Sequence, residues 1–204
     1  MTQFWTVQKR SVLDTVIQEG AYLPSISASD YIRNIPMLSQ TYSNIHKIFC
    51  DLNGYDPLAV SGMVFGFAKR VTFGDDDVQV VPYTDYEDFR QSIGFNREAV
   101  LSLWREFEKS DEEYVVLDLC YTEEFNWMAL DINDFQAIMP PITLGPPFRG
   151  EASLERILLS LSSGVPTMSE LPTTLYQVHA PYITRRNVRY VYPMFPLPDY
   201  EDYF

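Results

Sequence analysis

Apolar positions along the chain follow two spacings, which together predict a protein of mixed strands and helices. Short runs of β-branched, aromatic and aliphatic residues that end at turn residues indicate strands. Apolar residues three or four positions apart, with charged residues off that face, indicate helices. The predicted strands are 4–8, near 22–23, 63–72, 78–81, 114–119, 173–178 and 187–192, and the clearest helices are 12–19, about 39–52, 96–109 and 151–162, with shorter helical segments at 86–93 and 131–139.

These elements predict one α+β domain over residues 1–192, built on a mixed or antiparallel sheet with about four helices. Single residues mark where elements end or bend. Gly20 sits where a helix C-terminal stop belongs, and Thr84 or Asp85 is placed to cap a helix. Gly66, in the middle of a predicted strand, indicates a bulge or a close approach of another backbone.

Residues 193–204 form an irregular, Pro-rich, acidic-aromatic tail for which no regular structure is predicted. Its three prolines remove backbone donors and restrict the residues before them. Large apolar side chains are costly to leave in water, so Met194–Leu197 are expected to dock on the domain. Residues 199–204 are expected to stay exposed as a contact segment for a partner.

Composition and charge narrow the function classes. The 204-residue chain is 46% hydrophobic and 15% aromatic, which supplies a sizeable core and argues against a disordered protein. Its formal net charge of −13 repels nucleic acid and anionic membranes and favours a protein partner with a basic surface. We therefore expect no direct nucleic-acid binding and no membrane association.

The same features place the chain in a cytoplasm, either bacterial or that of a host. No basic, apolar leader opens the sequence, and no apolar run approaches the roughly 20 residues that a membrane-spanning helix needs. Cys50 and Cys120 both lie in apolar surroundings and are predicted to be buried free thiols rather than a disulfide or a metal pair.

Acidic residues gather at three places: a turn, the segments flanking the predicted strand 114–119, and the tail. We expect them to engage a basic groove on a protein, in the way that an inhibitor of a nucleic-acid-handling enzyme mimics phosphate. The first predicted function is therefore an acidic interaction module, such as a phage- or mobile-element-encoded inhibitor of a host protein. The candidate contact residues are Asp75, Asp76, Asp77, Glu112, Glu113, Glu123, Glu124, Asp199, Tyr200, Glu201 and Asp202.

Catalytic and metal-binding signatures are scarce. Gly62 and Gly66 are not followed by the Gly-Lys-Ser/Thr of a phosphate loop, and the acidic turn lacks the spacing of a calcium loop. Only His46 and His179 could serve as histidine bases, and His46 is interpreted as an ordinary surface or groove histidine. The residues favour a binding protein over an enzyme, and no catalytic residue, metal ligand or cofactor is assigned.

Three segments together suggest a family. The opening FWTVQ with the following EGAYLPS, the central YVVLDLCYTEEFNWMALDINDF and the late LYQVHAPYITRRNVRYVYPMF resemble an uncharacterised bacterial and phage-associated family. Members of that family open with a Trp-Thr-Ile-Gln-like strand. The family carries no established activity, so the resemblance implies a fold and a bacterial setting only.

The opening is also similar to the broad ADP-ribosyltransferase fold, in which NAD binds in a cleft between sheets. This resemblance implies an alternative function, a nucleotide- or NAD-binding enzyme on a degenerate fold of that kind. Its ligand residues would be Gln8, Gln177, Arg185 and Arg186, with an arginine meeting a phosphate. The catalytic pattern departs from the family, because the first strand lacks the usual His or Arg and Gln177 stands nearest to the late Glu.

Overall fold

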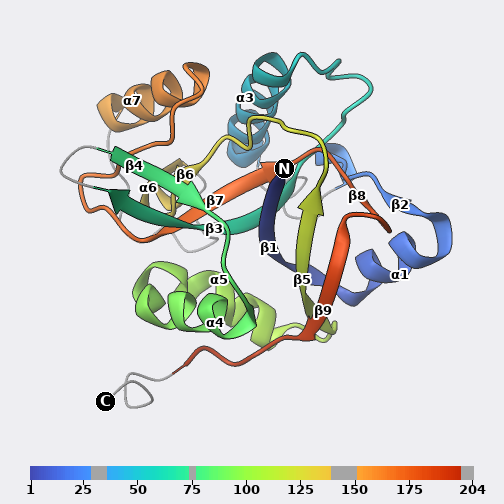
Figure 1. The fold of residues 1–204 in the computed structure, drawn as a ribbon. Coiled ribbons are helices and arrows are strands. Elements are labelled where there is room, and N and C mark those ends of the chain that lie inside the picture. The colour runs from blue at the N-terminus through green and yellow to red at the C-terminus, as the bar shows by residue number, and fades with distance from the viewer. Residues whose placement is uncertain (29–35, 74–76, 139–150, 199–204) are drawn as a thin grey trace.

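The chain folds around one antiparallel sheet with helices on both faces (Figure 1). The structure is a computed structural model, and it describes residues 1–28, 36–73, 77–138 and 151–198. The elements in chain order are β1 (Thr2–Lys9), α1 (Arg10–Glu19), β2 (Ala21–Tyr22), the 3₁₀ turn η1 (Ile26–Ala28), α3 (Pro36–Asn53), β3 (Val64–Phe73), β4 (Asp77–Val81), α4 (Tyr86–Phe95), α5 (Arg97–Lys109), β5 (Tyr114–Tyr121), β6 (Leu130–Asp131), α6 (Ile132–Ile138), α7 (Glu151–Ser162), β7 (Leu175–Ala180), β8 (Ile183–Thr184) and β9 (Val188–Pro193).

The strand order of the main sheet is β6-β7-β3-β1-β5-β9, with β4 also paired to β3, while β2 and β8 form a separate two-stranded sheet. All pairings between described strands are antiparallel, which confirms the predicted α+β class. The described ranges contain six α-helices rather than about four. Asp131 ends the short strand β6, and its carboxylate accepts a hydrogen bond from Asn133 N, which caps α6.

Alternation along the strands divides the core between the two faces of the sheet. Phe4 and Leu117 face α1, where Leu13 and Val16 complete one apolar cluster. Neighbouring residues such as Trp5 face α4 and α5, and their cluster is largely aromatic. A third cluster packs α3 and α7 against the end of the sheet that carries β6 and β7. The helix predicted over 96–109 matches α5, whose Trp104 is fully buried.

At the middle of the sheet, β1 is paired extensively with one neighbouring strand and only briefly with the other. β1 pairs with β5 over eight residue pairs, but among the described residues Trp5 with Phe67 is the one register pair that joins β1 to β3. Gly66 lies at this crossing, and a Cβ there would meet Phe4 Cδ2 at 2.2 Å and Trp5 O at 2.9 Å. This confirms the close approach predicted from Gly66. Beyond Trp5 the two strands carry no further register pair, and we call this opening, between residues 6–9 and 63–66, the β1–β3 split.

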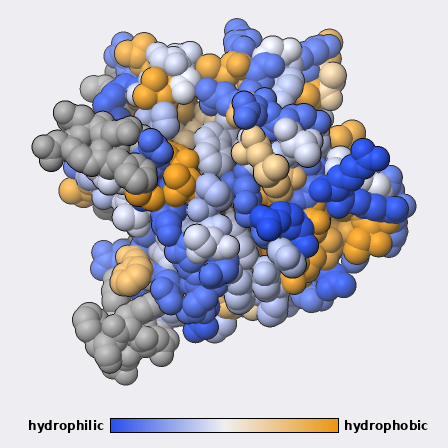
Figure 2. Space-filling view, viewed as in Figure 1, coloured by the Kyte–Doolittle hydropathy of each residue, from blue (hydrophilic) through white to orange (hydrophobic). Residues whose placement is uncertain are grey.

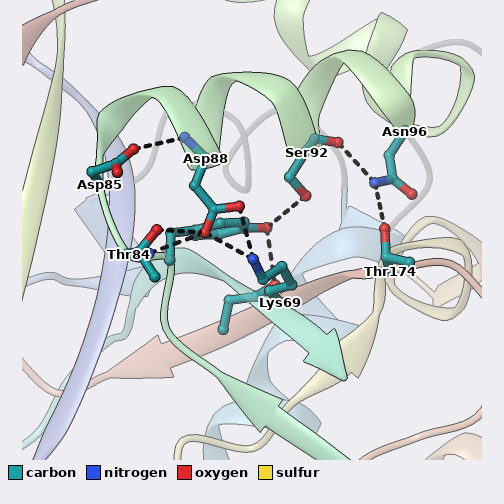
Figure 3. Close-up of polar contacts among 9 residues, drawn as sticks. Lys69, Thr84, Asp85, Asp88, Ser92, Asn96 and Thr174 are labelled. Atoms are coloured by element: carbon teal, nitrogen blue, oxygen red, sulfur yellow. Dashed lines mark hydrogen bonds and ion pairs between the residues drawn. The ribbon is translucent and has the colours of Figure 1, made fainter. Parts of the chain in front are cut away.

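A polar network fixes α4 against β3 (Figure 3). Asp85 caps α4 by accepting from Asp88 N, as one of the two predicted caps. Asp88 in turn accepts from Lys69 Nζ at 2.7 and 2.8 Å and from Thr84 N and Oγ1. Burial raises the pKa of the Asp88 carboxyl, but the hydrogen bonds from Lys69 and Thr84 outweigh burial, so the pKa is lowered. Asn96 Nδ2 extends the network to Thr174, just before β7.

The described part of the tail docks beneath α4 and α5, as predicted for Met194–Leu197. Phe195 is buried, and its carbonyl accepts from Trp104 Nε1 at 3.1 Å. Arg97 donates to the carbonyls of Leu197 and Pro198. The predicted contact segment 199–204 lies outside the described residues.

Candidate ligand-binding cavity

A cavity of about 620 Å³ opens at the β1–β3 split. Its walls come from the end of β1, the segment from β2 to η1, the start of β3, and one side each of α3, α5, α6 and β7. The apolar part is mostly aliphatic and aromatic. The lining residues with polar groups are Gln8, Lys9, Tyr22, Ser25, Tyr42, Ser102, Glu106, Tyr114, Gln136 and Gln177.

Phe65 forms the centre of the aromatic wall. Its ring lies 5.7 Å from that of Tyr42 and 6.2 Å from that of Phe135, both of which also line the cavity. On its other side the ring of Phe65 packs edge-on against His179 at 5.1 Å. Aromatic pairs at these distances are favourable and hold one another in place. The wall is therefore supported from behind by the core and does not depend on a ligand for its position.

Gln177 is the polar group that stands out in this wall. It lies on β7 in register with Phe67 of β3 on one side and Leu130 of β6 on the other, so its backbone is fixed from both sides. Its exposed fraction is 3%, and its Oε1 atom is buried without a hydrogen-bond partner among the described residues. A buried carbonyl left unpaired costs about 1–3 kcal/mol. A donor placed in the cavity would remove that cost.

The β1 side of the cavity is organised by a short relay of hydrogen bonds. Gln8 Nε2 donates to Thr6 Oγ1 at 2.7 Å, and Thr6 Oγ1 donates to the Phe65 carbonyl across the split. The relay fastens β1 to β3 at a point where they carry no register pair. The relay uses one N–H of the Gln8 amide, so its second N–H and its Oε1 remain for a ligand.

The helical side of the cavity carries negative charge. Ala99, Ser102 and Glu106 lie on α5 at helical spacing and all line the cavity. Burial raises the pKa of the Tyr42 hydroxyl, and the charge of Glu106 raises it further. Tyr42 therefore keeps its proton. Lys9 is the cation among the described lining residues, and its Nζ lies 2.9 Å from Glu112 Oε1.

The residues implied by the ADP-ribosyltransferase resemblance divide between two places. Gln8 and Gln177 line one cavity, on opposite sides of the β1–β3 split. Arg185 and Arg186 are not among its lining residues. Arg185 instead donates to the carbonyls of Val16, Ile17 and Gln18 at the C-terminal end of α1, which is a helix-capping role.

The described acidic candidates are spread along β5 and paired internally. Glu112 and Glu113 precede β5 and lie near Lys9 and Arg10, while Glu123 and Glu124 follow it. An eight-residue strand at about 3.4 Å per residue separates the pairs by roughly 24 Å. Glu123 accepts from Tyr182 Oη, and Glu124 lies 3.1 Å from the N-terminal amine. Hydrophilic and hydrophobic residues are interspersed over the face in Figure 2.

The other acidic candidates lie mostly outside the described residues. These are Asp75 and Asp76 in the turn, and Asp199, Tyr200, Glu201 and Asp202 in the tail. Asp77 is described only as the first residue of β4, with nothing described of its side chain.

His46 and Cys50 lie one turn apart on α3, the spacing at which a histidine base could serve a thiol nucleophile. His46 Nε2 lies 2.6 Å from the Val60 carbonyl, which can only accept, so Nε2 carries the proton. It cannot then take a proton from Cys50 Sγ at 3.5 Å, and burial followed by the charges of Asp51 and Asp56 raises the Cys50 pKa. The pair is not an activated thiol. The surface or groove position expected for His46 is wrong, because the segment ending at Val60 covers it to an exposed fraction of 8%.

Both cysteines are free, with Cys50 buried and Cys120 half-buried. Within the described ranges, no group of three or more His, Cys, Asp or Glu side chains is arranged to hold a metal ion. No described helix combines the length and the apolar character needed to cross a membrane.

Comparison of the chain with protein-family models, with curated proteins and with solved structures found no match. The geometry of the cavity is therefore the feature that points to a function. Sequence reasoning missed Tyr42, Phe65 and Glu106 as lining residues. The available signal was the strip of small and polar residues on the predicted helix 96–109, at Ala99, Ser102 and Glu106, beside its apolar face.

Proposed function

We propose that this protein binds a small molecule in the cavity at the β1–β3 split. The observation that carries the proposal is Gln177, which lines that cavity and whose buried Oε1 has no hydrogen-bond partner among the described residues. Native proteins rarely leave such an atom unpaired, and a functional role is one of the recognised reasons.

The size and lining of the cavity support the same proposal. Its volume of about 620 Å³ falls within the range of about 300–1,000 Å³ that is typical of small-molecule sites. Such sites combine an apolar, aromatic wall with a few fixed polar groups. Here the aromatic wall around Phe65 supplies the first feature, and Gln8 and Gln177 supply the second.

Two functions expected from the sequence stay predictions. The acidic interaction module draws no support from the positions of Glu112, Glu113, Glu123 and Glu124, since each has an internal partner. Nucleotide or NAD binding would use the same cavity through Gln8 and Gln177, but its proposed phosphate ligands Arg185 and Arg186 lie elsewhere.

A thermal-shift screen of a fragment library against the full chain tests the proposal. We expect some compounds to raise the melting temperature, because a ligand at 100 times its Kd stabilises the folded state by about 2.7 kcal/mol. In Ser102→Trp the new indole would occupy the cavity from α5, and the same compounds should no longer shift the melting temperature.

Arg105→Trp is the matched control, because Arg105 lies on the exposed side of the same helix and does not line the cavity. This variant should respond to the compounds as the wild type does. A library that stabilises neither protein, or one whose hits stabilise Ser102→Trp equally well, would remove the proposal.

A further inference from the structure

The chemistry of the cavity wall restricts the kind of ligand that it can hold. Gln177 Oε1 can only accept a hydrogen bond, so its ligand partner must donate one. The backbone that carries this acceptor is fixed, because β7 is paired on both sides at Gln177. On the opposite wall the Gln8 amide donates one N–H to Thr6 and keeps its second N–H and its Oε1 for a ligand. Both sides of the split therefore present an amide acceptor, and Gln8 presents a donor as well.

The charges around the cavity favour the same class of ligand. Glu106 lines the cavity, and its negative charge is felt at the Tyr42 hydroxyl across from it. The cation of the described lining, Lys9, already lies beside Glu112. The described lining contains no arginine that could form a bidentate pair with a phosphate or a carboxylate. A carboxylate or phosphate placed at Gln177 Oε1 could not donate to it, and Glu106 would repel that charge.

The aromatic wall suits a ligand of mixed character. The faces of Phe65 and Tyr42 can pack against an apolar ring, and they also attract a positive charge held near them. We propose that the ligand is an organic cation, with an apolar ring system against Phe65 and a protonated nitrogen that donates to Gln177 Oε1. This inference rests on the proposed function and names the chemical class that the cavity takes.

Three probes that share one indole-ethyl body test the inference by isothermal titration calorimetry at pH 7 and low salt. They are tryptamine, tryptophol and indole-3-propionate, which carry an ammonium, a hydroxyl and a carboxylate respectively. Hydrogen bonds to charged groups are stronger than neutral ones, so tryptamine should bind about tenfold more tightly than tryptophol. Indole-3-propionate should bind more weakly than either.

Two variants assign the preference to named atoms. Glu106→Gln should remove most of the difference between tryptamine and tryptophol, whereas Glu98→Gln, on the same helix but outside the cavity, should preserve it. Gln177→Leu should weaken both probes several-fold, because each needs the acceptor. Thermal unfolding of each variant without probe checks that it is folded.

The outcomes separate this inference from the proposed function. If tryptophol or indole-3-propionate binds as tightly as tryptamine, or if Glu106→Gln leaves the order unchanged, the cationic class is wrong while the binding cavity stands. If none of the three probes binds, the test passes to the library compounds that stabilise the wild type but not Ser102→Trp. A majority of neutral or anionic molecules among those compounds overturns the inference. If no compound at all requires the open cavity, the proposed function itself fails.

Discussion

Trp5 of β1 is in register with Phe67 of β3, and on the described residues this single pair joins the two strands at the centre of the sheet. Gly66 lies next to this pair and is pressed against Phe4 and the Trp5 carbonyl. From Gly66 toward Met63 the two strands carry no further register pair, and the cavity occupies the opening. The tight crossing and the cavity are thus two consequences of the same divergence of β1 from β3.

Gly66→Ala should destabilise the protein by roughly 1–3 kcal/mol, the usual cost of forcing extra atoms into a packed core. The added Cβ would lie 2.2 Å from Phe4 Cδ2, so the Phe4 ring or the crossing itself must move. Urea unfolding measures the change. Gly20→Ala is the control, because an added Cβ at Gly20 would meet no neighbouring atom. Gly20 has a φ of 93°, so this substitution should cost only the backbone strain of a left-handed alanine, about 1–2 kcal/mol. A negligible cost at Gly66 would show that the crossing is looser than the structure implies.

Arg185→Ala should lower the free energy of unfolding by about 1 kcal/mol, because the guanidinium compensates the C-terminal carbonyls of α1. Arg186→Ala, at the neighbouring exposed position, should change it by less than about 0.5 kcal/mol. Neither variant should alter ligand binding. If Arg185→Ala weakened ligand binding and left stability unchanged, Arg185 would be a ligand-binding residue, as the ADP-ribosyltransferase resemblance implies, and not a helix cap.

His179 should make the protein less stable as pH falls from neutrality. Burial lowers the pKa of its imidazole from 6.5 to about 4, although the Met128 and Trp127 carbonyls, which accept from Nδ1, oppose the shift. The unfolded chain binds the proton first, so the contribution of neutral His179 is full above pH 6.5 and is lost between pH 6.5 and pH 4.

Urea unfolding of the wild type and of His179→Gln at several pH values in this range measures the effect. The wild-type advantage should shrink as pH falls, and an NMR titration of the His179 ring should show no protonation at pH 5.5. A ring that titrates near 6.5 would contradict the buried, neutral state.

Asp88 should show a pH dependence in a lower window. Its pKa is lowered below 3.8 by Lys69 and Thr84 despite burial, so its contribution is full above pH 3.8 and is lost as pH falls through the folded-state value. Asp88→Asn should cost about 1.5–3 kcal/mol at pH 7, the range for hydrogen bonds to charged groups. The difference from the wild type should persist at pH 5 and decline below pH 3.8. A difference that already vanishes at pH 5 would mean that the pair with Lys69 is not formed in solution.

The local elements were predictable because their signals are local. The cap at Asp85, the stop at Gly20 and the burial of Trp104 follow from residue type and spacing within a few positions. Docking of Phe195 was also predictable, since a large apolar side chain is costly to leave in water.

The cavity was not predictable in the same way. It depends on how far β1 and β3 stay paired, and that register is set by contacts between residues about 60 positions apart, such as the bond from Thr6 to the Phe65 carbonyl. Gln8 and Gln177 were predicted as ligand residues only because of the resemblance to the ADP-ribosyltransferase fold. Nothing in their local sequence marks either residue as lining a cavity. His46 was misplaced for a related reason, since the covering segment that ends at Val60 has no hydrophobic period of its own.

Methyl NMR of the full chain labelled at its methionines tests the central claim most directly. Met63 lines the cavity, whereas Met128 and Met194 pack in core clusters outside its lining and serve as internal controls. On titration with the compound that most stabilises the wild type, the Met63 methyl resonance should move and saturate with the same Kd as the thermal shift, while those of Met128 and Met194 stay in place. Saturable binding that leaves Met63 unmoved and shifts Met128 or Met194 would contradict a ligand site at the β1–β3 split.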